Sequence, residues 1–309
     1  MKSETFTFKA SDGMQIFTYK WMSDDASVVK GTVQIAHGMA EHAGRYERFA
    51  EALTKAGYAV YANDHRGHGK TAGSQEKVGY FADENGWEKV VEDMHTLTGI
   101  IKNDYPKKPF FLFGHSMGSF LSRHYSMLYA NELSGLVLSG TGGDPGAMGK
   151  LGLFIAKMDA KFHGKKAKSA IMNKLSFGAF NGAFKPNRTN YDWLSRDNAE
   201  VDKYISDPLC GTVFTAGFFY DMLGGIGYIN KKENIAKIPK NLPIYIFSGA
   251  KDPVGANTKG VSQVYNAFKK AGIVDMEIKF YENGRHEMLN EINRDEVFSD
   301  VIAWLNKHI

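Results

Sequence analysis

The chain has 309 residues, of which 43% are hydrophobic and 23% are charged, so it is long enough to bury a full core and has the composition of a globular protein. Its formal net charge of +4 is too mild to indicate a nucleic-acid-binding protein, and no nucleic-acid partner is expected. The single cysteine, Cys210, excludes an internal disulfide and fits a reducing compartment. With no apolar signal segment at the N-terminus and no stretch as long as a membrane span, the sequence favours a soluble cytoplasmic protein.

Strands and helices alternate along the first half of the chain. Residues 6–9 and 15–21 alternate polar and apolar side chains around Ser11-Asp12-Gly13, which predicts an antiparallel hairpin. Further strands are predicted at 31–36, 58–62, 110–113 and 136–139, and helices at 46–55, 87–102 and 119–130. This alternation predicts an α/β fold with a mostly parallel central sheet and helices on both faces.

A glycine-bracketed insertion interrupts the alternation. Glycines at 140–146 open it and glycines at 224–227 close it. We expect a helical cap at 142–227, inserted between the two parts of an α/β core at 1–141 and 228–309. The core resumes with strands at 242–248 and 276–281 and helices at 261–271 and 295–309. We expect only a few of the cap's aromatic residues to line a pocket; these residues are Phe154, Phe162, Phe177, Phe180, Phe184, Trp193, Phe214, Phe218, Phe219 and Tyr220.

The most informative stretch runs from Phe110 to Ala130. An apolar strand is followed by the G-x-S-x-G pattern of Gly114, Ser116 and Gly118, and then by a helix, which is the order that a nucleophile elbow requires. The serine of such an elbow sits on a strained turn, so its neighbours must lack side chains that would clash with the strand or the helix. We therefore predict that Ser116 is a nucleophile at a helix N-terminus, where free N–H groups favour developing negative charge.

A serine hydroxyl needs a base within reach, and the loops after the last two predicted strands supply the candidates. His286 follows the final strand and is the predicted base, and Asp252 follows the preceding strand and is predicted to orient it. The chain order Ser, Asp, His is that of an α/β-hydrolase, and all three loops open at one edge of the sheet. Asp144 is a rival acid, but it lies in the glycine-rich entry to the insertion. His65 and His68 also follow a strand, and we interpret them as scaffold.

Two backbone N–H groups are expected to form an oxyanion hole. One belongs to Met117, directly after the nucleophile, and the other to Met39, in the loop after the strand at 31–36. No metal site is expected, because His286-Glu287 does not extend to H-E-x-x-H and the chain has no cysteine cluster.

Three motifs resemble the monoacylglycerol lipase and lysophospholipase-like branch of the α/β-hydrolases. They are His37-Gly38-Met39-Ala40-Glu41-His42 with Arg45-Tyr46, Asp64-His65-Arg66-Gly67-His68-Gly69 and Gly114-His115-Ser116-Met117-Gly118; residues 201–209 of the insertion are similar to that family too. The resemblance implies the α/β-hydrolase fold and hydrolysis of a carboxylic ester through an acyl-enzyme, without a cofactor. It also implies that Glu41, Arg45 and His115 lie near the alcohol portion of the substrate, although a structural role for Glu41 and Arg45 is an equal alternative.

The expected partner is a small-molecule or lipid ester, and two other hypotheses stay open. An amide or peptide hydrolase, as in proline aminopeptidase-like relatives, would need acidic residues near the pocket to capture an amine, and Glu200 and Asp202 are the only suggestive pair. A non-catalytic small-molecule receptor could use the same scaffold. Transient membrane-surface contact through the cap is a further hypothesis, although a solvated helix face is favoured for its lysines, which are Lys161, Lys165, Lys166 and Lys168.

Overall fold

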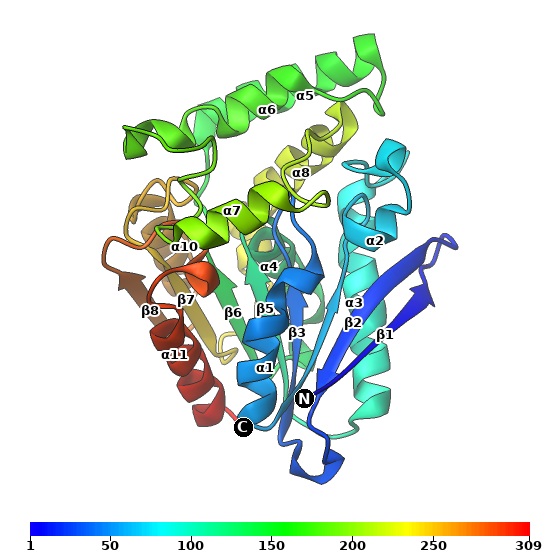
Figure 1. The fold of residues 1–309 in the computed structure, drawn as a ribbon, viewed down its shortest axis with the longest axis vertical. Helices are drawn as coiled ribbons and strands as arrows, with labels where there is room; N and C mark the ends of the chain where they lie inside the picture. Colours follow the sequence, from blue (N-terminus) through cyan, green and yellow to red (C-terminus); the bar gives the residue numbers. More distant parts are fainter.

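Over the part of the chain that the structure describes, eight strands form one mostly parallel sheet (Figure 1). The computed structural model describes residues 1–309, apart from the side chains of Ala26 and Gln75. The strands are β1 (Lys2–Lys9), β2 (Gln15–Met22), β3 (Gly31–Ala36), β4 (Tyr58–Asn63), β5 (Phe110–His115), β6 (Gly135–Ser139), β7 (Ile244–Gly249) and β8 (Met276–Tyr281). Their order is β1-β2-β4-β3-β5-β6-β7-β8, and β3 to β8 are parallel while the β1–β2 hairpin is antiparallel. The predicted hairpin and parallel sheet are confirmed.

Helices cover both faces of the sheet, as expected. They are α1 (Glu47–Lys55), α2 (Gly69–Ala72), α3 (Gly86–Asp104), α4 (Met117–Tyr129), α5 (Gly146–His163), α6 (Ala170–Phe177), α7 (Asn198–Ser206), α8 (Ala216–Ile229), α9 (Lys232–Ile235), α10 (Lys259–Lys270) and α11 (Arg294–Lys307). α1 and α11 lie on one face, where Phe49 packs against Phe298 with ring centroids 5.1 Å apart. α3, α4 and α10 lie on the other face, where Val91, Leu121 and Phe268 share one core cluster.

The differences from the predicted elements are short and local. α4 begins at Met117, two residues earlier than predicted, because the chain enters the helix directly from the turn at Ser116. α2 and α9 were not predicted, because a helix of four residues is too short to show a helical period.

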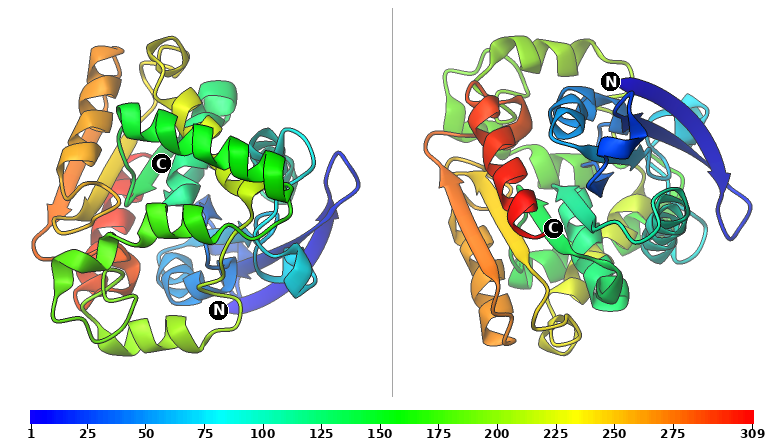
Figure 2. Two further views of the ribbon diagram at one scale, coloured as in Figure 1. Left: turned by 90° about the horizontal axis from the view of Figure 1, so that it is seen from above. Right: turned by 90° about the horizontal axis from the view of Figure 1, so that it is seen from below.

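The segment between β6 and β7 holds α5, α6, α7, α8 and α9. α5 and α6 lie across the top of the molecule in Figure 1, and the view from above in Figure 2 shows them spread over the sheet. α8 packs against α3 and α4 and also contacts α5. The boundaries of the cap at residues 142 and 227 stay a prediction. None of the helices in the described part of the chain is both long enough and apolar enough to cross a membrane.

Candidate active site

Ser116 lies in a strained turn between β5 and α4. β5 is buried at every residue and pairs with β3 on one side and β6 on the other, so its carboxyl end is fixed in the middle of the sheet. Ser116 has φ 53° and ψ −121°, a conformation that non-glycine residues rarely adopt. Its N–H donates to the carbonyl of Ser139 at 2.9 Å, which ties the turn to β6. The geometry is that of the nucleophile elbow expected from the sequence.

The two glycines around Ser116 are required by close backbone contacts. A Cβ atom on Gly118 would lie 2.0 Å from the carbonyl oxygen of Ala36, and one on Gly114 would lie 2.4 Å from that of Gly118. Both separations are far shorter than any van der Waals contact. α4 can therefore lie directly against the end of β3 only if these positions carry no side chain.

Replacing Gly118 with alanine is expected to lower the free energy of unfolding by about 3 kcal/mol or more, because backbone of β3 or α4 must move. Thermal and urea unfolding measure the loss. Gly99→Ala is the matched control, since Gly99 lies in α3 and a Cβ there meets nothing within 4 Å; its effect should stay within about 1 kcal/mol. Equal stability of the two variants would contradict the packing argument.

His286 and Asp252 form a buried hydrogen-bonded pair. The Nδ1 atom of His286 lies 2.9 Å from both carboxylate oxygens of Asp252, and the two side chains are 4% and 0% exposed. The same carboxylate accepts hydrogen bonds from Ser248 Oγ at 3.1 Å and from the Val254 N–H at 2.9 Å. These contacts hold it in place. Burial favours the neutral imidazole, but the charge and hydrogen bond of Asp252 outweigh it and raise the pKa of His286 above its ordinary value.

Ser116 and His286 line one cavity, as the sequence predicts for a nucleophile and its base. The cavity has a volume of about 380 Å³, and Met39 lies on the same wall. Gly140, at φ +58°, packs closely against the pair, because a Cβ there would lie only 3.1 Å from the imidazole of His286. Asp144, the rival acid, lines a separate groove between α5 and α8 instead.

The backbone N–H groups of Met39 and Met117 are both free to bind an oxyanion. Met117 is the first residue of α4, so its N–H has no acceptor within the helix. Among the described residues no acceptor binds the Met39 N–H, whereas the neighbouring Gly38 N–H is taken by Glu41 Oε1 at 2.6 Å. The Met117 side chain is buried in the core, so only Met39 contributes a side chain to the cavity.

Glu41 and Arg45 join the loop that carries Met39 to the loop that carries His286. Glu41 accepts hydrogen bonds from Gly38 N–H, from the Tyr46 hydroxyl at 2.9 Å and from Arg45 at 2.8 Å. Arg45 also donates twice to Glu287, at 2.7 Å each. Although burial opposes ionisation, the charge of Arg45 holds the pKa of Glu287 below its ordinary value. The polar atoms of both residues are engaged in a structural contact, and their contact with substrate stays a prediction.

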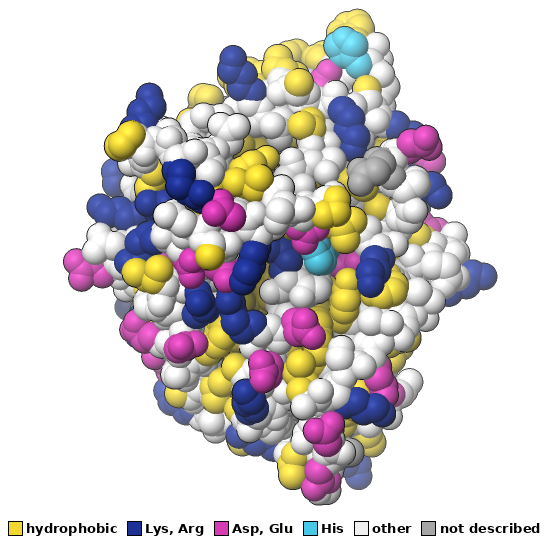
Figure 3. Space-filling view, viewed as in Figure 1, with side chains coloured by type: hydrophobic (Ala, Val, Ile, Leu, Met, Phe, Trp, Pro, Cys, Tyr) yellow, Lys and Arg dark blue, Asp and Glu magenta, His cyan; other side chains and the backbone are white. Residues whose placement is uncertain are grey.

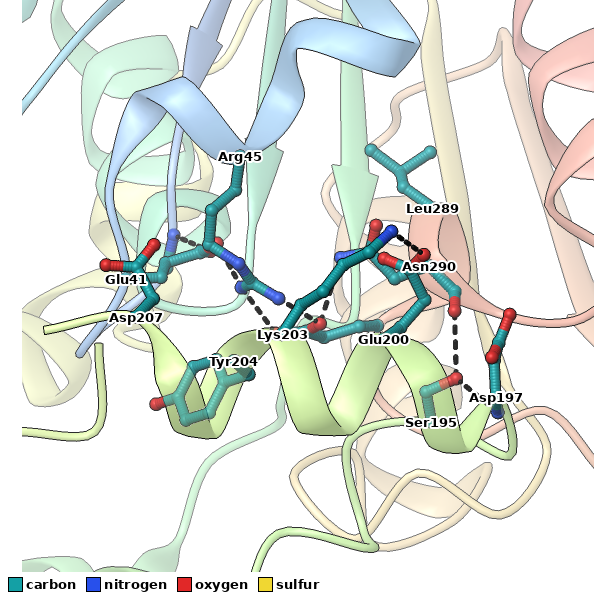
Figure 4. Close-up of polar contacts among 12 residues, drawn as sticks. Glu41, Arg45, Ser195, Asp197, Glu200, Lys203, Tyr204, Asp207, Leu289 and Asn290 are labelled. Atoms are coloured by element: carbon teal, nitrogen blue, oxygen red, sulfur yellow. Dashed lines mark hydrogen bonds and ion pairs between the residues drawn. The ribbon is translucent and has the colours of Figure 1, made fainter. Parts of the chain in front are cut away.

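The cap helix α7 is attached to this same region (Figure 4). Tyr204 lies under the guanidinium of Arg45, with the ring centroid 4.9 Å from its central carbon, and its hydroxyl donates to the Ala40 carbonyl at 2.9 Å. One turn earlier in α7, Glu200 accepts hydrogen bonds at both carboxylate oxygens from Arg48 of α1, at 2.9 and 3.2 Å. α7 is therefore held against α1 and against the loop after β3 that carries Met39, called the oxyanion loop below, by groups that are mostly buried.

Apart from His286, the histidines near the serine are buried side chains that support the surrounding loops. His115 packs on His286 with ring centroids 4.7 Å apart, and burial lowers the pKa of its imidazole to about 4. His65 and His68 are buried, as expected for scaffold, and burial lowers the pKa of each well below its ordinary value. His37 accepts a hydrogen bond from the backbone N–H of His65 at 2.9 Å, which fixes the loops after β3 and β4 to each other.

Glu200 and Asp202, the acidic pair that an amine-binding site would have used, both form ion pairs with other side chains. Glu200 binds Arg48 and Lys203, and Asp202 pairs with Arg188 at 2.7 Å. Neither carboxylate lines the cavity that holds Ser116.

Comparison with known proteins places the chain in a family. The family model described as "Serine aminopeptidase, S33" matches residues 27–293. The chain belongs to this family. It is 31% identical to the monoacylglycerol lipase of Mycolicibacterium smegmatis over 98% of this chain and 97% of that protein, and 26% identical to the monoglyceride lipase of Rattus norvegicus over 97% and 89%. A crystal structure of a highly thermostable carboxyl esterase from Bacillus coagulans in complex with glycerol superposes with a TM-score of 0.91, at 31% identity and 99% coverage of both chains.

The protein is thus a carboxylic ester hydrolase of the α/β-hydrolase fold, similar to monoacylglycerol lipases. The resemblance inferred from its motifs is confirmed, and the receptor hypothesis is set aside.

The cap of this hydrolase brings few of its aromatic residues to the cavity, as expected. Of the ten aromatic residues named above, Phe177 and Trp193 line it, and Trp193 lies 5.1 Å from His286 between ring centroids. Tyr204 and Glu287 also line the cavity but were not singled out from the sequence. The similarity of residues 201–209 to the family could have indicated Tyr204, whereas Glu287 is recognisable only through its contact with Arg45.

Proposed function

We propose that this hydrolase cleaves esters of a single acyl chain, similar to monoacylglycerols or lysophospholipids, through an acyl-enzyme on Ser116. The observation that carries the proposal is the cavity that Ser116 and His286 line together with Phe177, Trp193 and Tyr204. The aromatic side chains suit an acyl chain, and the polar side chains that also line the cavity, such as Asn173 and Asn181, suit a polar head group. The relatives named as monoacylglycerol lipases support the choice of substrate class.

Each residue has a defined role in the proposed reaction. Ser116 Oγ attacks the ester carbonyl while His286 accepts its proton, and Asp252 stabilises the imidazolium that forms. The N–H groups of Met39 and Met117 bind the oxyanion of the tetrahedral intermediate. His286 then protonates the leaving alcohol, and a water molecule that gives its proton to His286 releases the acid.

Hydrolysis of p-nitrophenyl esters from acetate to palmitate, measured beside monoacylglycerols, tests the substrate class. We expect the highest kcat/KM at medium or long chains, because burial of each methylene group contributes about 0.8 kcal/mol. Turnover of acetate and butyrate alone would overturn the lipase-like proposal in favour of a small-ester hydrolase.

The description of the matching family leaves one alternative, an aminopeptidase-like amide hydrolase. A proline p-nitroanilide in the same assay distinguishes it. With Glu200 and Asp202 both paired outside the cavity, we expect no turnover of this amide above the rate of a Ser116→Ala control.

We further propose that the cap contacts a lipid surface. Apolar side chains on α5 and α6 are unusually exposed, with Phe162 at 74%, Met148 at 72% and Phe154 at 59%, and yellow side chains stand among dark blue ones at the top of Figure 3. Lys161 lies beside Phe162, whereas Lys165 and Lys168 donate to the carbonyls of Asp83 and Val78 in the segment between α2 and α3. Exposed apolar groups with lysines among them suit an anionic membrane surface.

Replacing Phe154 and Phe162 together by glutamate is expected to reduce binding to anionic phospholipid vesicles by about tenfold or more, since apolar burial is lost and negative charge is added. Co-sedimentation measures the bound fraction. Val274→Glu is the matched control, because Val274 is 79% exposed but lies outside the cap, between α10 and β8. An equal effect of both changes would show that net charge alone governs binding.

We also propose that the protein resides in the cytoplasm, which the single cysteine supports.

A further inference from the structure

Three metal-ligating side chains meet where the end of α7 reaches the oxyanion loop. His42 follows Glu41 in that loop, while Asp207 and Cys210 come from the turn after α7, and Figure 4 labels Asp207 at the end of this helix. One potential ligand atom from each of the three lies within 4.8 Å of the others. The sequence showed no such site, because its ligands are separated by about half the chain and follow no motif spacing.

A cation bound here would replace one existing contact, the hydrogen bond between His42 and Asp207. His42 Nε2 lies 2.8 Å from Asp207 Oδ2, and the two side chains are 11% and 28% exposed. The other ring nitrogen, His42 Nδ1, is buried and has no hydrogen-bond partner among the described residues. Without a metal, Nε2 carries the proton that it donates to Asp207. A metal ion at Nε2 would replace this hydrogen bond and leave the ring proton on Nδ1, which no other contact requires to be an acceptor.

The donor set matches one class of metal ion. An imidazole nitrogen, a carboxylate oxygen and a thiolate sulfur are the three ligand types of Zn²⁺, which accepts them in a tetrahedral site with water as the fourth ligand. Burial raises the pKa of the Cys210 thiol, and the nearby charge of Arg45 lowers it. A metal ion would displace the thiol proton on binding.

We propose that His42, Asp207 and Cys210 form a binding site for Zn²⁺ or a cation of the same class. The bound ion bridges the oxyanion loop and the cap segment that follows α7. It thereby replaces the hydrogen bond of His42 to Asp207 with metal–ligand bonds, beside the Tyr204 hydroxyl and the Gly211 N–H, which both donate to the Ala40 carbonyl. The site lies beside the catalytic machinery and contributes no group to it.

Metal titration of the full chain tests this site without relying on activity. After treatment with a chelator, Zn²⁺ is titrated by calorimetry, and Co²⁺ is added while thiolate-to-cobalt charge-transfer absorption is recorded. We expect one equivalent of Zn²⁺ to bind, an absorption band from Co²⁺–thiolate bonding, and a rise in Tm with Zn²⁺. Cys210→Ser should abolish the band and weaken Zn²⁺ binding at least about tenfold.

Two further variants complete the design. Asp207→Asn should also weaken Zn²⁺ binding, and it keeps the question answerable if Cys210→Ser does not fold. His163→Ala is the matched control, since His163 forms an exposed pair with Asp159 at 2.7 Å, and it should bind Zn²⁺ as the unaltered protein does. Equal Zn²⁺ affinity of the unaltered protein and the Cys210→Ser variant, or a Co²⁺ complex without the thiolate band, would overturn the proposal.

Discussion

Replacing Ser116 with alanine is expected to lower ester turnover by about 10⁴-fold or more, because no acyl-enzyme can form. The residual rate comes from substrate binding and the oxyanion N–H groups alone. The strained turn depends on backbone contacts, such as the hydrogen bond from the Ser116 N–H to Ser139, rather than on the hydroxyl. The variant should therefore keep the Tm of the unaltered protein or exceed it.

A p-nitrophenyl ester assay measures the loss, and labelling with a fluorophosphonate provides a second observation. The reagent should modify Ser116 in the unaltered protein and leave the variant unlabelled. Ser126→Ala is the matched control: Ser126 lies on the same helix, and its hydroxyl bonds only to the Arg123 carbonyl at 2.8 Å. Turnover within tenfold of the unaltered protein in Ser116→Ala would refute the proposed nucleophile.

The second large effect is expected from Asp252→Asn, which should lower kcat by about 10³–10⁴-fold. The amide cannot stabilise the imidazolium and can hold His286 in the wrong tautomer. Asp144→Asn is the comparison that decides between the two candidate acids. Asp144 accepts a hydrogen bond from the Gly146 N–H at 2.8 Å, which asparagine can also accept, so this variant should stay within a few fold of normal turnover. The reverse pattern would assign the acid to Asp144.

The pH profile of kcat/KM reports the same pair. His286 must be neutral to accept the serine proton, and Asp252 raises the pKa of His286, so activity is lost as the pH falls through this raised value. Without the carboxylate charge the pKa of His286 falls, and the acid limb of the residual activity of Asp252→Asn should move to lower pH. An acid limb that stays in place would mean that another group controls it.

Most of what could be predicted came from patterns of residues that are adjacent in the sequence. The elbow was recognisable because the strand, the two glycines and the helix around Ser116 are adjacent in the chain. Asp252 and His286 could be predicted from their positions after two strands, because parallel strands end at one edge of a sheet. The mostly parallel sheet followed from the same alternation, whereas the order of its strands was not predicted.

Contacts between distant residues could not be predicted in this way. Arg45 and Glu287 are 242 residues apart, and nothing in the sequence near either residue indicates that they pair. The same holds for His42 with Asp207 and for the hydroxyl of Tyr204 on the oxyanion loop. The exposed faces of α5 and α6 show why periodicity fails in the cap, since their apolar residues do not all face a core.

The burial of the contacts around Arg45 has a consequence for ester hydrolysis at high salt concentration. Arg45 and Glu287 are 11% and 7% exposed, so dissolved ions screen their attraction far less than they screen charges on the surface. At 1 M salt, where the Debye length is about 3 Å, we expect the loop that carries Met39, the loop that carries His286 and α7 to stay joined, while the proposed attraction of cap lysines to an anionic surface is largely screened. High ionic strength should therefore spare hydrolysis of dissolved esters and weaken the charge-dependent part of the proposed binding to an anionic surface.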